Sequence, residues 1–152
     1  VVTVEEKTPE SPWQVTEYVD EFGDPTGETT IRAIFMDGKF SNSATTNSPL
    51  AVKLVQAEGG VLLSLHEYQD PKVTTFGYEN SFGKISVKYP SGKKEDVEVF
   101  NYDGVGHFIG DDTNLYDSLM TEGNNKQIAF FIEEDRFTKY GNSTYKFTVM
   151  SR

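Results

Sequence analysis

Two apolar segments on either side of a Gly-Gly turn constrain the fold more than any other part of the sequence. Residues 50–56 (LAVKLVQ) and 61–68 (VLLSLHEY) are rich in aliphatic side chains, and Glu58-Gly59-Gly60 lies between them. Glycine accepts the positive φ that a tight hairpin turn requires. The three segments together therefore predict an antiparallel β-hairpin. Their nearly continuous apolar character favours central strands over edge strands.

Similar strand-like segments recur along the chain, with Gly, Pro and Asp between them. Residues 85–89 and 96–100 alternate apolar and polar side chains around Pro90-Ser91-Gly92-Lys93, which predicts a second hairpin. Asp37-Gly38 predicts another two-residue turn, with a strand returning from Lys39. Four further strands are predicted at 13–19, 29–36, 127–132 and 145–150.

One segment has helical spacing. Between Asp111 and Gly123, apolar residues recur at the spacing of a helix face, Asp112 or Thr113 can cap its start, and Gly123 can end it. About eight strands and one short helix indicate an all-β fold. We expect an antiparallel β-sandwich, with a closed β-barrel as the alternative. Residues 13–152 are expected to form a single domain, preceded by a flexible leader at 1–12.

Charge and composition exclude several classes of partner. The chain has 24 acidic and 14 basic residues, and its net charge of −10 disfavours nucleic acid and anionic membrane surfaces as partners. It contains no Cys, and no stretch approaches the roughly 18 apolar residues that span a bilayer. Because the chain begins at Val1 rather than Met, we expect a processed or trimmed form from which an upstream signal or lipid anchor has been removed.

Two polar or aromatic segments are candidate binding surfaces. The first is the run 40–48, in which Ser41, Asn42, Thr45 and Asn47 could either contact a partner or hold their own backbone in an irregular conformation. The second is the long segment 69–83, which carries Tyr78 and Phe82. Long loops on a rigid β scaffold are where binding residues concentrate.

Catalytic and metal sites have weaker support. Asp20, Glu21 and Asp24 supply the oxygen ligands that Ca²⁺ prefers, but Asp next to Gly or Pro is also ordinary turn chemistry. His66 and His107 are the only imidazoles, and no Gly-x-Ser-x-Gly nucleophile motif accompanies them. We therefore expect no catalytic residues and no cofactor, with Ca²⁺ at the acidic turn as the alternative.

Three segments together resemble a known group of proteins. Trp13-Gln14-Val15, the acidic turn within 18–27 (YVDEFGDPTG) and the run 40–48 (FSNSATTNS) are similar to a family of small uncharacterised bacterial proteins. Many members are exported or lipid-anchored, so the resemblance implies a periplasmic, extracellular or cell-envelope location, with the cytoplasm as the alternative. The predicted strand order also resembles, more faintly, a periplasmic accessory protein of type VI secretion.

Three functions are consistent with these features. The first is a non-enzymatic, exported binding module that contacts a protein or a cell-envelope glycan. The second is a carboxylate-dependent glycan hydrolase, motivated by the acidic excess and the aromatic residues. The third is an acidic inhibitor that mimics nucleic acid, which would need carboxylates in a row on one face. We favour the first because no catalytic motif is present.

Overall fold

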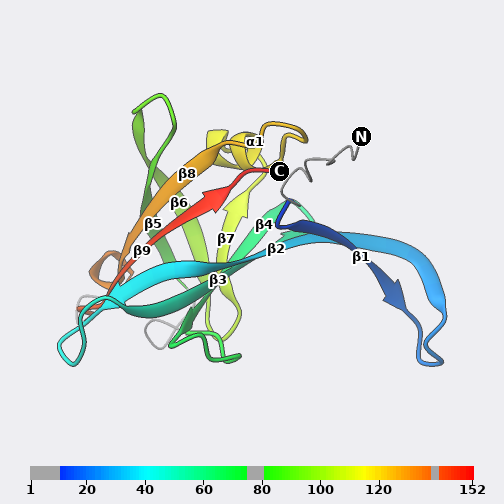
Figure 1. Ribbon diagram of the computed structural model, residues 1–152, viewed down its shortest axis with the longest axis horizontal. Helices are drawn as coiled ribbons and strands as arrows, with labels where there is room; N and C mark the ends of the chain where they lie inside the picture. Colours follow the sequence, from blue (N-terminus) through cyan, green and yellow to red (C-terminus); the bar gives the residue numbers. More distant parts are fainter. Residues whose placement is uncertain (1–10, 75–80, 138–140) are drawn as a thin grey trace, which may run out of the picture.

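The computed structural model describes residues 11–74, 81–137 and 141–152. In these residues it holds nine β-strands, one short α-helix and one short 3₁₀ helix, η1 (Figure 1). In chain order they are β1 (Trp13–Val19), β2 (Pro25–Ser41), β3 (Ser48–Ala57), β4 (Gly60–Glu67), β5 (Ser81–Lys88), β6 (Lys94–Tyr102), β7 (Gly106–Gly110), α1 (Asn114–Met120), β8 (Gln127–Glu133), η1 (Glu134–Arg136) and β9 (Thr144–Met150).

The strands form one antiparallel sheet that closes on itself. Its order is β1-β2-β3-β4-β7-β6-β5-β8-β9, and a further pairing of β2 with β9 joins the two ends. The result is an eight-stranded barrel with β1 as an extra strand outside the ring. The all-β class with one short helix is thus confirmed, and the architecture is the closed barrel rather than two packed sheets.

The length and the bend of β2 close the barrel. This strand has 17 residues, and β1 and β9 pair with successive parts of its same edge. A register shift between Phe35 and Gly38 bends β2 between the two pairings. The predicted hairpin turn at Asp37-Gly38 is therefore wrong, because the two residues lie within a bulged strand. A Cβ on Gly38 would lie 2.9 Å from the Leu50 carbonyl oxygen, which explains the glycine there.

The hairpin of β1 and the first half of β2 extends away from the barrel as a two-stranded arm (Figure 1). Its base is fixed by Trp13, which is almost fully buried. The Trp13 indole Nε1 donates a hydrogen bond to the Met150 carbonyl oxygen at 2.7 Å. The first and last described strands therefore meet at this point, where β2 and β9 have already separated.

The barrel interior is filled by alternate side chains of the eight strands. In β3 these are Leu50, Val52 and Leu54, and in β9 they are Tyr145, Phe147 and Val149. The helix α1 adds Leu115 and Leu119, both fully buried, to this core. As predicted, Thr113 caps the helix, since its Oγ1 accepts a hydrogen bond from the Tyr116 N–H at 3.1 Å.

The other two predicted hairpins are confirmed as β3–β4 and β5–β6, and the last two strands pair as β8–β9. The strand β7 was not predicted from the sequence, because its two glycines and its histidine are more typical of a loop than of a strand. Gly106 is required there for another reason: a Cβ on it would lie 2.5 Å from the Leu63 carbonyl oxygen. The absence of a side chain lets β7 approach β4 closely.

Candidate functional site

Outward-facing apolar side chains form a continuous row across five neighbouring strands. In the sheet register Val55 is opposite Leu62, Leu62 is opposite Phe108, Phe108 is opposite Phe100, and Phe100 is opposite Phe82. Residues paired directly across strands point to the same face of a sheet. We call these five residues the apolar row. With strands about 4.8 Å apart, the row is roughly 19 Å long.

Aromatic rings dominate one end of the row. Phe82 and Phe100 pack edge to face with their centroids 4.8 Å apart, and the neighbouring Tyr102 lies 4.6 Å from Phe100. Phe82 is 65% exposed and Tyr102 is 41% exposed, although both have aromatic partners. Clustered, exposed aromatic side chains of this kind mark interaction surfaces more often than isolated exposed residues do.

Beside these rings the barrel wall opens into a groove, because β7 leaves β6. The two strands pair only where Phe100–Tyr102 faces Gly106–Phe108. Beyond that point Gly110 pairs with Gly60 of β4, and the Asp111 N–H donates to the Gly59 carbonyl oxygen at 2.8 Å. The end of β7 is thus held against β4, away from β6.

We call this opening the β6 groove. Its volume is about 500 Å³, and it is lined by Phe82, residues 95–100 of β6, Phe108, Gly110 and residues 112–114. Along Lys94–Val99, β6 pairs with β5 on one side only, so within the described residues its other edge has no ladder partner. An unpaired edge presents free backbone donors and acceptors.

The lining of the β6 groove is acidic. It contains Glu95, Asp96, Glu98 and Asp112, and no Lys or Arg is among its described lining residues. Glu95 Oε2 accepts a hydrogen bond from the Tyr89 hydroxyl at 2.9 Å. Burial, followed by the bond to Glu95, raises the pKa of Tyr89, so the hydroxyl keeps its proton and remains a donor.

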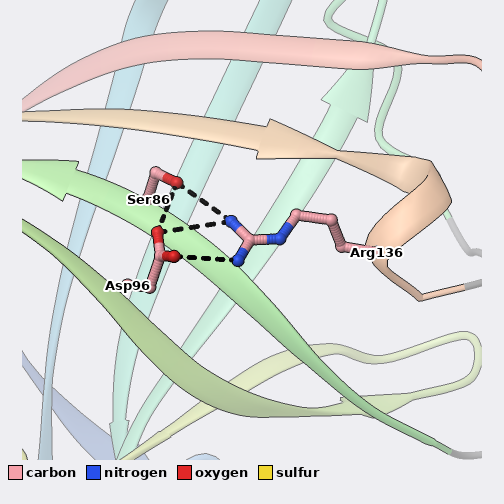
Figure 2. A network of polar contacts seen from close by, with 3 residues as sticks. All are labelled: Ser86, Asp96 and Arg136. Carbon is pink, nitrogen blue, oxygen red and sulfur yellow. Dashed lines mark hydrogen bonds and ion pairs between the residues drawn. The ribbon is translucent and has the colours of Figure 1, made fainter.

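One of these carboxylates already has a cation. Figure 2 shows Arg136 reaching from η1 to Asp96, with its Nη2 3.0 Å from Oδ2 and its Nη1 3.3 Å from Oδ1. The Ser86 hydroxyl donates to Asp96 Oδ1 at 2.8 Å and accepts from Arg136 Nη1 at 3.0 Å. The bonds from Arg136, and then from Ser86, lower the pKa of Asp96.

Within the described part of the chain, the carboxylates of Glu98 and Asp112 have no cation as close as the one that Asp96 has. Lys84 lies opposite Glu98 in the sheet register. Among the described residues, however, neither Glu98 nor Asp112 has a Lys, Arg or His nitrogen within 4.0 Å, since the ion pairs there join Arg136 to Asp96 and Arg152 to Glu122. Glu98 and Asp112 therefore carry the negative charge that the groove offers to a partner.

A larger groove of about 1350 Å³ follows the gap between β2 and β9 and continues over β8 and β5. Phe35, Phe131 and Phe147 supply part of its apolar lining. Its described charged lining balances, with Lys88, Lys94 and Lys146 against Asp37, Glu95 and Asp96. This groove consequently selects no sign of charge in a partner.

The polar run holds its own backbone. Asn42 Oδ1 accepts from the N–H groups of Ala44 at 2.8 Å and Thr45 at 3.1 Å. Ser41 Oγ accepts from the Asn47 N–H at 2.9 Å, and the Thr45 and Ser48 hydroxyls hydrogen-bond to each other. These contacts favour the alternative in which the run 40–48 holds its own backbone in an irregular conformation. These residues are not among those lining the β6 groove.

The second predicted binding surface, the segment 69–83, is only partly described by the structure. Tyr78 lies outside the described residues, whereas Phe82 is at one end of the apolar row. No sequence pattern marks Phe100, Leu62 and Val55 as surface residues, because apolar residues in a strand are normally assigned to its buried face. Phe100 pairs with Phe82 within the β5–β6 hairpin, but only the register through β7 connects Leu62 and Val55 to them, and that strand was not predicted.

The acidic turn uses its carboxylate locally. Asp20 Oδ1 accepts from the N–H groups of Phe22 at 2.8 Å and Asp24 at 2.9 Å, which is an Asx-type turn. No group of three or more Asp, Glu or His side chains suited to a metal ion is found among the described residues. Asp20, Glu21 and Asp24 thus form a turn on the exposed arm.

The two histidines occupy structural positions. The His66 ring bonds through Nε2 to Ser64 Oγ at 3.0 Å and through Nδ1 to the Asp70 carbonyl oxygen at 3.1 Å. His107 is buried inside the barrel, edge-on to Phe137 with the ring centroids 5.0 Å apart. Burial lowers the pKa of His107 to about 4, so it is neutral at pH 7.

A partly buried acid, Glu67, lies at the end of β4. Burial raises the pKa of Glu67, although the Tyr145 hydroxyl donates to its Oε1 at 3.5 Å and thereby lowers it. The nearby charge of Glu134 raises the pKa of Glu67 further. A carboxyl group that holds its proton to a higher pH than usual is a candidate general acid.

No protein-family model, curated protein or solved structure matches this chain. In the part of the chain that the structure describes, no helix has the length and apolar character needed to cross a membrane. Family membership and export accordingly stay predictions.

Proposed function

We propose that this chain is a non-enzymatic binding module that contacts another protein through the apolar row. The row itself is the observation that carries the proposal, because five apolar side chains from different strands share the solvent-facing side of the barrel. A barrel needs apolar residues on its inner face only, so this second set has no role in the core.

The size and geometry of the row favour a protein over a glycan. A row roughly 19 Å long fits the width of a protein interface, in which about 800 Å² is buried on each partner. The rings in the row and beside it are steeply tilted to one another, at 80° for Phe82 and Phe100 and 59° for Phe100 and the neighbouring Tyr102. Successive sugar rings would therefore find no common plane on which to stack.

Phe82 is the residue best placed to anchor a partner, since it is the most exposed ring of the row. Covering its exposed surface contributes about 2 kcal/mol to binding, which corresponds to roughly thirtyfold in affinity. We include export in the proposal, because the resemblance of three segments to exported proteins motivates it. Fractionation of the native cells tests this, with a cytoplasmic signal contradicting it.

Photo-crosslinking tests the surface directly. With p-benzoylphenylalanine in place of Tyr102, we expect one discrete adduct with a second protein in extracts of the native cells. The same group in place of Phe22, which is 83% exposed on the arm, should give none. Phe82→Ser should remove the adduct, whereas Phe22→Ser should retain it.

An adduct that survives Phe82→Ser would contradict a role for the row. Cross-linking only to a second copy of the chain, or only to a glycan, would overturn the assignment to a different protein partner. Thermal melting of each variant controls for folding, and exposed positions such as 22 and 82 should change the melting temperature little.

One observation favours the hydrolase as a second candidate, namely the raised pKa of Glu67 beside the Tyr145 hydroxyl and near Glu134. Glycan hydrolysis needs one protonated and one ionised carboxyl group. If this is the activity, Glu67→Gln should abolish release of reducing ends from cell-wall glycan. Glu58→Gln, on the exposed β3–β4 turn, should retain it. Absence of release by the wild type would eliminate the candidate.

A further inference from the structure

The free edge of β6 has the geometry of a site for one more strand. From Lys94 to Val99 the strand pairs with β5, and its opposite edge borders the β6 groove. The gap is wedge-shaped, since β6 and β7 join at Phe100 and Phe108 and then separate toward Gly110. An extended segment can add to such an edge through backbone hydrogen bonds.

The outer face of β6 determines which side chains such a segment needs. Asp96, Glu98 and Phe100 alternate with the buried Val97 and Val99, and therefore point outward. An added strand would place two of its outward residues beside Asp96 and Glu98, two positions apart, and would end where Phe100 already pairs with Phe108. Asp112 lines the groove with them, at the separated end of β7.

We propose that the β6 groove binds an extended segment of a partner protein that carries Lys or Arg at two alternate positions, followed by an aromatic or aliphatic residue. The proposal rests on the binding function proposed above and names the part of the partner that is recognised. The strand hydrogen-bonds to the free edge of β6. Its cations face Glu98 and Asp112, and its apolar residue contacts Phe100 and Phe108.

Charge complementarity selects this occupant. The described groove lining holds four carboxylates, of which Asp96 is bound by Arg136 and Glu95 by the Tyr89 hydroxyl. Glu98 and Asp112 keep their charge for a partner. Aromatic rings beside carboxylates also favour cations directly, because a Lys or Arg over a ring face is attracted by the π electrons. An acidic segment would be repelled.

Two labelled synthetic peptides test the inference by fluorescence anisotropy. One contains Lys-Val-Arg-Val-Phe between serines, and the other replaces both cations with Glu. We expect the wild-type chain to bind the cationic peptide at least tenfold more tightly than the acidic one. Binding should weaken further as salt is raised from 20 to 300 mM, because the Debye length falls from about 20 Å to below 10 Å.

The matched variants remove equal charge from two places. E98Q combined with D112N should weaken binding of the cationic peptide about tenfold or more. E17Q combined with E28Q, both on the exposed arm, should leave it within twofold of the wild type. Amide hydrogen exchange on β6 should slow on binding, and N-methylation of both Val residues in the peptide should abolish binding, since backbone donors are then lost.

Different failures separate the two proposals. Equal binding of both peptides, or unchanged exchange on β6, overturns the strand-addition inference, while a Phe82-dependent adduct would still support the apolar row. Conversely, if E98Q with D112N releases the peptide but no Phe82-dependent adduct is found, the groove stands and the proposed role of the row fails. Sedimentation of the wild type controls for a second copy, and self-association lost in E98Q with D112N would overturn the occupant named here.

Discussion

Replacing Gly60 with Ala tests whether β4 and β7 are packed as closely as the wall of the barrel requires. A Cβ on Gly60 would lie 2.1 Å from the Ile109 carbonyl oxygen and 2.8 Å from the Phe108 ring. The carbonyl belongs to the strand itself, so it cannot rotate away. We expect Gly60→Ala to push β7 from β4 at its end.

The expected loss of stability in Gly60→Ala follows from the contacts between β4 and β7 that the substitution breaks. The register pairs Gly60 with Gly110 and Val61 with Ile109. Opening these pairs removes two or three hydrogen bonds at about 1 kcal/mol each and partly exposes Val61 and Ile109, which are fully buried. We therefore expect a loss of about 3 kcal/mol in the free energy of unfolding. For a domain of this size the melting temperature should fall by roughly 6 to 12 °C.

Gly110→Ala is the matched control, on the opposite strand of the same pair. Its Cβ would meet only the exposed Asp112 carboxylate oxygen, at 2.6 Å, and that side chain can rotate. We expect a change within about 1 kcal/mol, since Ala loses less backbone entropy than Gly. Urea unfolding followed by circular dichroism measures both variants. If the two variants differ by less than 1 kcal/mol, the close approach of β4 and β7 is refuted.

Three further predictions concern single side chains. Trp13→Phe should lower the free energy of unfolding by about 1 to 2 kcal/mol in urea, because Met150 loses its indole donor; an unchanged midpoint would show the bond to be dispensable. Because the pKa of His107 is lowered to about 4, the unfolded chain binds more protons between pH 6.5 and 4, so stability should fall by about 3 kcal/mol as pH decreases through that range; His107→Gln should show no such component in pH-dependent melting, and an identical pH profile would contradict the assignment. Asn42→Ala should destabilise by about 1 kcal/mol because two N–H groups lose their acceptor, with Ser43→Ala as the neutral control; equal melting temperatures would favour a binding role for the run.

Local sequence patterns were sufficient to predict the β3–β4 and β5–β6 hairpins and the helix α1. Gly59-Gly60 and Pro90-Ser91-Gly92 lie at the β3–β4 and β5–β6 turns, and Thr113 caps α1. These features depend on backbone conformations a few residues long, which particular amino acids favour or forbid. Sequence patterns report such preferences directly.

Closure of the barrel could not be predicted in the same way. It depends on three residue pairs between β2 and β9, more than 100 positions apart, and on the bulge near Gly38. An Asp-Gly pair is compatible with a hairpin turn and with a bulge, and only contact with Leu50 distinguishes them. The sequence pattern is therefore equally compatible with a sandwich and with a barrel.

The candidate site was predicted only in part, for a related reason. Phe82 was recognised from its place near a long loop, but the row and the groove depend on β7. That strand carries Gly106 and Gly110, which lower strand propensity, and Gly106 also allows close packing against β4. Its existence follows from tertiary contacts and leaves no clear pattern in the sequence.

The hydrogen bond between Trp13 and Met150 has a consequence for the timing of folding. It joins residues 137 positions apart, and Trp13 is the only tryptophan in the chain. On the ribosome, the hairpins β3–β4 and β5–β6 can form early, but the ring cannot close until β9 has emerged. Tryptophan emission therefore reports the last event of assembly, while circular dichroism reports the earlier strands. The delay between the two signals measures how long the nascent chain remains an open sheet.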